Sequence, residues 1–282
     1  MDIKKIMVIG AGQMGSGIAQ VMAQAGIATK LYDIEKAFVD KGMAGIEKNL
    51  ARSVEKGRLS ADEKGTVMGL LSPSLSLSDA ADCDLVVEAV VENKQVKANI
   101  FGELDAVCPA HTILASNTSS LPITEIAAAT KRPEKVIGMH FMNPVPVMKL
   151  VEIIRGLLTD DATYQAVADL TLKIQKTPVE VRDVPGFISN RVLQVMINEA
   201  IYCLYEGVAD VQGIDTVMKL GMNHPMGPLE LADLIGLDTV LFILQVMYDG
   251  YSDSKYRPCP LLRQYVAAGK LGKKSRSGFY TY

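Results

Sequence analysis

A histidine and a glutamate twelve positions apart form the most suggestive pair of reactive side chains in this chain of 282 residues. His140 and Glu152 stand at the two ends of the segment HFMNPVPVMKLVE, and His140 is one of only three histidines. Imidazole exchanges protons near neutral pH, and a buried carboxylate beside it would orient the ring and stabilise its charged form. Such a pair suits general acid–base chemistry, for example removal of the hydroxyl proton of a secondary alcohol as hydride leaves.

The sequence leaves open what Glu152 contacts. It lies in the apolar run VMKLVEII, where a carboxylate is costly to bury unless it is paired. One interpretation pairs it with His140. The other places it on the exposed side of a strand, paired with Lys149 or Arg155. The residue pattern by itself favours neither.

A glycine-rich loop, GAGQMG at residues 10–15, follows an apolar segment and opens a helical pattern. In this motif Gly10 permits a tight turn, Gly12 lets a pyrophosphate approach the backbone, and Gly15 lets the helix pack close to the strand. The helix N-terminus then offers unpaired N–H groups to the phosphates. The pattern predicts a dinucleotide site, and the alternative is a purely structural glycine turn.

Asp33 ends the next predicted strand, ATKLYD, at the distance from the glycine loop that dinucleotide-binding folds require. Its carboxylate can accept hydrogen bonds from an adenosine ribose and would repel a 2′-phosphate, which favours NAD over NADP. FAD is a further alternative because flavins use the same glycine motif. The chain has no obvious second dinucleotide motif.

Polar residues follow several of the predicted strands. Because ligands of open α/β sheets bind beyond the carboxyl ends of the strands, we expect these residues to converge on one cleft. They are Ser116, Asn117, Ser119, His140 and Asn143. Taken singly, each could be a turn residue, and the segment NTSS could simply cap the next helix.

The elements that must position these residues alternate between strands and helices up to about residue 184. We expect strands at 3–9, 28–33, 84–91, 112–117, 135–141, 149–156 and 178–183, and helices at 15–26, 36–56, 94–108, 121–129 and 160–175. This alternation predicts an α/β, Rossmann-type doubly wound, mostly parallel sheet. The remaining sequence shows only helical periodicity. We therefore predict a domain at 1–184 and an all-helical domain at 185–282.

The bulk composition excludes several classes of protein. A hydrophobic content of 49% with 22% charged residues is typical of globular proteins. A net charge of -3 argues against a nucleic-acid or membrane-surface partner. No apolar run approaches about 18 residues, so no transmembrane helix is expected. The four cysteines lack metal-site spacing, so no metal is expected, and cytoplasm is the default location.

Long segments distributed along the chain resemble the 3-hydroxyacyl-CoA dehydrogenase family, and in particular its short bacterial members. They are GAGQMGSGIAQ, ASNTSSLPITEIA, GMHFMNPVPVMKLVEII, DVPGFISNR and NHPMGPLELADLIGLD. The resemblance spans essentially the whole chain. It implies reversible, NAD-dependent conversion of (S)-3-hydroxybutyryl-CoA to acetoacetyl-CoA, an acyl-CoA substrate, and a homodimer built on the C-terminal helices.

The resemblance also implies roles for individual residues. It gives His140 and Glu152 as the catalytic pair, with Ser119, Asn143 and Asn190 near the reacting groups and the thioester. The implied cofactor contacts are Gly10, Ala11, Gly12, Gln13, Met14, Gly15, Asp33, Glu92, Lys97, Ser119, Asn143 and Lys274. Ser119, Asn143, Asn190 and, on a looser match, Lys56 are the implied substrate and CoA contacts.

Two alternative functions share this resemblance. The same fold resembles L-gulonate 3-dehydrogenase, which would act on a non-CoA hydroxy acid. It also resembles lens lambda-crystallin, a structural protein. An intact pair of His140 and Glu152 argues only mildly against the second alternative, because a recruited protein can keep its site.

Overall fold

The computed structural model describes residues 2–282, which divide into two compact units. The first unit ends at Asp183, and the second is Val184–Tyr282. Each unit has a hydrophobic core of its own.

The first unit is built on one eight-stranded sheet with the strand order β3-β2-β1-β4-β5-β6-β7-β8. The strands are β1 Lys5–Ile9, β2 Ala28–Tyr32, β3 Leu71–Ser74, β4 Leu85–Glu88, β5 Ile113–Ser116, β6 Val136–Phe141, β7 Leu150–Arg155 and β8 Thr177–Arg182. Neighbouring strands are parallel except β6 and β7, which are antiparallel. The predicted Rossmann-type, mostly parallel sheet is therefore confirmed.

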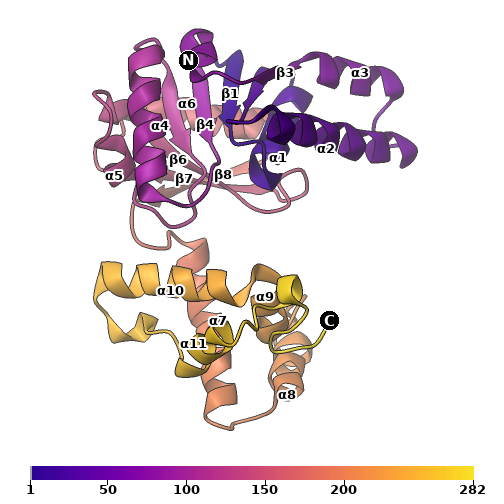
Figure 1. Cartoon of the computed structure of the whole chain (residues 1–282), viewed down its shortest axis with the longest axis vertical. Coiled ribbons are helices and arrows are strands. Elements are labelled where there is room, and N and C mark those ends of the chain that lie inside the picture. Colours follow the sequence, from indigo (N-terminus) through magenta and orange to yellow (C-terminus); the bar gives the residue numbers. More distant parts are fainter. Residues whose placement is uncertain (1) are drawn as a thin grey trace. The chain divides into compact units, whose positions relative to one another are not determined.

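Helices lie on both sides of this sheet (Figure 1). They are α1 Gln13–Gln24, α2 Lys36–Glu55, α3 Ala61–Gly69, α4 Lys94–Val107, α5 Ile123–Ala127 and α6 Asp161–Lys173, with short 3-10 turns at η1 Leu77–Asp82 and η2 Pro133–Lys135. The central strands β4 and β5 are buried at every residue, which explains why they read as continuous apolar runs rather than alternating ones. One core cluster packs alternate strand residues against α1 and α6.

Besides the short 3-10 turns, strand β3 and helix α3 of the first unit were not expected from the sequence. Strand β3 has only four residues and contains Pro73, which a sheet tolerates at its edge, where β3 lies. Helix α3 begins with a capping box in which Ser60 accepts from the Glu63 N–H and the Glu63 side chain accepts from the Ser60 N–H. This S-x-x-E signature was present in the sequence.

The second unit is helical, as predicted. Its helices are α7 Ser189–Tyr205, α8 Val211–Thr216, the π-helical turn η3 Val217–Gly221, α9 Pro228–Ile235, α10 Leu237–Tyr251 and α11 Pro260–Ala267, with short turns at η4 Ser254–Tyr256 and η5 Lys273–Ser275. Between residues 184 and 282 the only β-type pairings are two isolated bridges. Among the described helices no single one is long and apolar enough to cross a membrane. The pair α9 and α10 passes a length and composition test only jointly, with a 96° bend between them.

Candidate active site

The antiparallel pairing of β6 and β7 places His140 directly opposite Glu152. Nδ1 of His140 lies 2.7 Å from Oε2 of Glu152. Both residues are buried, with exposed fractions of 8% and 1%. The stretch from residue 140 to residue 152 thus comprises the end of β6, the connecting loop and the start of β7, and directly opposed side chains on antiparallel strands are close neighbours.

The structure decides the question that the sequence left open for Glu152. The alternative partner Arg155 instead donates to Asp161 at 2.6 Å and to Glu180 at 3.3 Å. The other alternative, Lys149, is exposed, whereas Glu152 is buried. When Nδ1–H donates to the carboxylate, Nε2 on the far side of the ring can take or give a proton.

The glycine loop connects β1 to α1, and its glycines meet different constraints. Gly10 has φ +100°, and a Cβ there would lie 2.6 Å from the Ala89 carbonyl oxygen. A Cβ on Gly15 would lie 1.7 Å from the Gly10 carbonyl oxygen, so α1 can approach the strand only at a glycine. A Cβ on Gly12 would meet nothing within 4 Å, which leaves its backbone open to a ligand.

The N-terminus of α1 is suited to binding an anion. No side chain caps it, and its first turn, which begins at Gln13 and Met14, contains no acidic residue. It borders a pocket of about 1090 Å³. Uncapped N–H groups and the positive end of the helix dipole attract phosphate groups. The arrangement fits the pyrophosphate of a dinucleotide.

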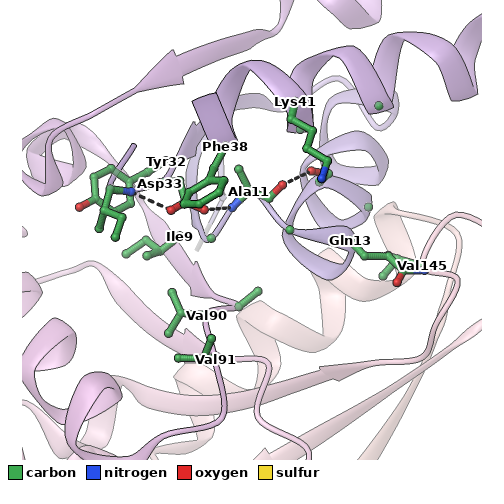
Figure 2. A pocket seen from close by; sticks show the side chains of 18 of the residues that line it. Ile9, Ala11, Gln13, Tyr32, Asp33, Phe38, Lys41, Val90, Val91 and Val145 are labelled. Atoms are coloured by element: carbon green, nitrogen blue, oxygen red, sulfur yellow. Dashed lines mark hydrogen bonds between the residues drawn. The ribbon is translucent and has the colours of Figure 1, made fainter. Parts of the chain in front are cut away.

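Asp33 lies just after β2 and contacts the glycine loop. Its Oδ2 accepts from the Ala11 N–H and its Oδ1 from the Ile34 N–H, both at 2.8 Å. Figure 2 shows Asp33 and Phe38 at one end of the pocket, and Gln13 and Val145 at the other. Carboxylate lone pairs beyond those used here suit the hydroxyls of an adenosine ribose.

Glu92 holds the segment that follows β5. Its Oε1 accepts from the Thr118 hydroxyl, from the Ser119 N–H at 3.1 Å, and from the N–H and hydroxyl of Ser120 at 3.2 and 3.0 Å. Its Oε2 lies 3.3 Å from the Lys97 ammonium. Burial by itself raises the pKa of Glu92, but Lys97 and the hydroxyl donors outweigh it, and the net pKa is lowered.

Glu88, at the end of β4, is a buried residue that the sequence predictions did not include. Its Oε1 accepts from Lys97 Nζ and from the Val90 N–H, both at 2.7 Å, and its Oε2 from the Ser116 hydroxyl at 2.7 Å. Glu88 and Lys97 have side-chain exposures of 0% and 1%. An acid in the apolar run LVVEAVV is costly to bury without a partner, so the signal was present in the sequence.

The loop 142–149, between β6 and β7, carries Asn143. The Gln13 side-chain amide donates to Asn143 Oδ1 at 3.1 Å, which connects this loop to the start of α1. Asn117, at the end of β5, accepts from the Phe141 N–H at 2.9 Å through its Oδ1. These bonds bring the glycine loop, the end of β5 and the end of β6 together at one edge of the sheet, where the sequence predicted a cleft.

Three further predicted contacts belong to other segments of the chain. Lys56 is an exposed residue at the C-terminal end of α2. Asn190 and Lys274 belong to the second unit. Asn190 is buried on α7 and accepts from the Gln194 amide at 3.5 Å, whereas the Lys274 ammonium lies 2.5 Å from Asp238. Among residues 2–282 no cluster of side chains could hold a metal ion.

Comparison with known proteins gives the family. The model of the 3-hydroxyacyl-CoA dehydrogenase NAD binding domain matches residues 5–184, and the model of that family's C-terminal domain matches residues 186–282. The cofactor expected from Asp33 was NAD, and this expectation agrees with the match to an NAD binding domain.

Relatives match along their full lengths. A Bacillus subtilis (strain 168) protein named "Probable 3-hydroxybutyryl-CoA dehydrogenase" is 61% identical over 282 residues, covering 100% of this chain and 98% of that protein. A Bradyrhizobium diazoefficiens 3-hydroxybutyryl-CoA dehydrogenase is 56% identical over 280 residues, covering 99% and 96%. The crystal structure of (S)-3-hydroxybutyryl-CoA dehydrogenase from Ralstonia eutropha superposes with a TM-score of 0.98 at 47% identity, covering 100% and 99% of the two chains.

Two family models cover nearly the whole chain, and the relatives match it from end to end. The chain therefore belongs to the 3-hydroxyacyl-CoA dehydrogenase family, and its first unit carries the NAD-binding domain of that family.

Proposed function

We propose that this protein interconverts (S)-3-hydroxybutyryl-CoA and acetoacetyl-CoA with NAD(H). The 2.7 Å contact between His140 and Glu152, at the sheet edge that also carries the glycine loop, is the observation on which the proposal depends. The names of the relatives at 56 and 61% identity support the substrate. NAD supplies the hydride acceptor for oxidation of the substrate's secondary alcohol.

The chain's own residues handle the proton. In oxidation, His140 takes the hydroxyl proton at Nε2 while Nδ1–H stays on Glu152, and the carboxylate stabilises the imidazolium that forms. In reduction, the imidazolium returns that proton to the new alkoxide. Ser119 and Asn143 position the β-oxygen and the nicotinamide, and Asn190 positions the thioester.

The remaining roles are proposed on the same basis. Residues 10–15 hold the pyrophosphate and Asp33 the adenosine ribose, with Glu92, Lys97 and Lys274 as further cofactor contacts and Lys56 as a CoA contact. A homodimer would cover apolar side chains that the second unit exposes, among them Val192, Leu220 and Phe242. Light scattering of the purified protein measures its oligomeric state. The cytoplasmic location also stays a prediction.

The test of the mechanism follows NADH consumption with acetoacetyl-CoA. We expect His140→Gln to lose turnover by at least about 10²-fold, because a positioned acid–base group contributes roughly 10² to 10⁴. NADH binding, followed by its fluorescence, should persist. His111→Gln is the matched control, since His111 is exposed beside Asp84. Near wild-type turnover of His140→Gln would refute the assigned mechanism.

The two alternative functions are less favoured, because the full-length relatives carry the 3-hydroxybutyryl-CoA dehydrogenase name. Comparing turnover on gulonate with turnover on acetoacetyl-CoA distinguishes the first alternative, a gulonate dehydrogenase, from the proposed function. High NADH affinity with very low turnover on both compounds would support the structural role instead.

A further inference from the structure

Lys176 is a buried cation that the mechanism above does not use. It lies between α6 and β8 with an exposed fraction of 7%. Its ammonium donates to the carbonyl oxygens of Val145 and Met148, at 2.6 and 2.5 Å. Among residues 2–282, no carboxylate lies within the 4.0 Å of its ammonium that would form an ion pair.

The backbone at the end of α6 directs this side chain inward. Gln175 takes a positive φ of 58°, and the Lys176 N–H donates back to the Thr171 carbonyl oxygen at 3.0 Å. The next residue, Thr177, donates its N–H to the Lys149 carbonyl oxygen at 2.6 Å. The segment 176–177 therefore contacts the carbonyl groups of residues 145, 148 and 149, along most of the second half of the loop 142–149.

A cation in this place is energetically unfavourable by itself. Burial, and then the nearby charge of Lys149, lower the pKa of Lys176. An apolar side chain of similar size would avoid that cost, but it would leave two carbonyl oxygens without a donor. Bonds from a charged donor are stronger than neutral ones. The arrangement is therefore suited to fixing the loop rather than to filling space.

The loop that Lys176 holds forms one wall of the cofactor pocket. Asn143, Pro144, Val145 and Pro146 all line that pocket. Val145 also packs on α1, because a Cβ built on Gly17 would lie 2.9 Å from the Val145 Cβ. The same loop joins the strands that carry His140 and Glu152. A shift of this loop would move the pocket wall and Asn143 together.

We propose that Lys176 is a positioning residue for the dehydrogenase: it does not line the pocket, and it acts by fixing the loop 142–149. This inference rests on the proposed function for its effect on turnover. Its effect on NADH binding does not depend on the identity of the substrate.

The experiment compares Lys176→Met with Leu170→Ala. Met is similar in length to Lys but donates no hydrogen bond. Leu170 is buried in the core on α6, so its truncation lowers Tm without removing a donor to the loop. Both variants are assayed well below their Tm for the NADH Kd, from fluorescence, and for kcat and KM with acetoacetyl-CoA.

We expect Lys176→Met to weaken NADH binding and lower kcat by about tenfold or more, because displacement of a positioning group by about 1 Å can cost 10²-fold. Leu170→Ala should stay within about twofold of wild type. Lys176→Gln retains one donor and should fall between Met and wild type, and it replaces Met if that variant fails to fold. Equal losses in Lys176→Met and Leu170→Ala, or no loss in either, would overturn the proposal. If wild type binds NADH but does not turn over acetoacetyl-CoA, the proposed function fails while the Kd comparison still tests Lys176.

Discussion

Two segments at the carboxyl ends of neighbouring strands are stabilised by charges of opposite sign, a half-buried carboxylate and a buried ammonium. The segment 117–120, after β5, directs N–H and O–H donors toward the Glu92 carboxylate. The loop 142–149, after β6, directs carbonyl oxygens toward the Lys176 ammonium. The comparison teaches that the sign of the charge follows from which backbone groups each segment leaves unpaired: free N–H groups need an acceptor such as a carboxylate, and free carbonyl oxygens need a donor such as an ammonium.

The two charges differ in how they are compensated. Glu92 has Lys97 as a counterion, and Lys97 in turn bonds to Glu88, which is fixed by Ser116. Lys176 has carbonyl partners and no carboxylate within ion-pair distance among the described residues. The first segment is thus part of a chain of alternating charges, and the second depends on one side chain.

The largest effect should come from breaking the chain of alternating charges at Lys97. Lys97→Met leaves the carboxylate of Glu88 buried and uncompensated. We expect the free energy of unfolding, measured in urea by circular dichroism, to fall by about 3–5 kcal/mol, as for other buried pairs that lose one partner.

Two further variants show whether that loss comes from the uncompensated charge. Combining Lys97→Met with Glu88→Gln removes both members of the pair and should recover most of the stability. Lys94→Met, on the same helix, removes only an exposed pair with Glu125 and should change stability by about 0–1 kcal/mol. If Lys97→Met lowers the free energy of unfolding no more than Lys94→Met does, the buried charges around Lys97 contribute no more to stability than an exposed ion pair.

An intermediate effect should come from the bond that connects the two segments. Asn117→Ala leaves the Phe141 N–H, at the end of β6, without its side-chain acceptor. An unsatisfied buried donor costs about 1–3 kcal/mol, so we expect a loss in that range in the same urea experiment. Gln165→Ala is the control, because Gln165 pairs only with Asp169 on an exposed helical face. If the two losses are equal, the segments are not coupled through Asn117.

At the carboxyl ends of the strands, the sequence predicted which residues lie there better than it predicted their hydrogen-bond partners. Strand ends were recognisable from apolar runs followed by polar residues, so His140, Asn117 and Ser119 could be assigned to one cleft. The pairing of Glu152 needed the antiparallel register of β6 and β7, which the sequence pattern alone did not specify.

The buried charges were harder to predict, for different reasons. Glu88 stands in a buried strand, where, as for Glu152, a carboxylate is costly to bury unless it is paired. No feature of the sequence indicated that its partners are Lys97 and Ser116. Lys176 gave no signal, because a lysine near the end of a helix is ordinarily an exposed residue that favours the helix dipole. Its inward direction follows from the positive φ of Gln175.

The smallest effect on stability should appear when the segments held by Glu92 and Lys176 are compared as a function of pH. The lowered pKa of Glu92 means that its ionised form stabilises the fold. That contribution is complete above the ordinary glutamate pKa of about 4.3 and is lost as pH falls through the lower folded value. The stability difference between wild type and Glu92→Gln should therefore shrink between pH 7 and pH 3.5.

For Lys176 we expect no change in the stability difference over the same acid range. Its pKa is lowered from that of an ordinary lysine, so any pH dependence lies on the alkaline side, where the burial cost is relieved as the pH rises. Urea unfolding at pH 7 and pH 3.5 should thus give the same difference between wild type and Lys176→Met. The acid titration should act on the segment held by Glu92 and leave the loop held by Lys176 unaffected. Equal acid sensitivity of the two stability differences would mean that the sign of the charge does not distinguish the two segments.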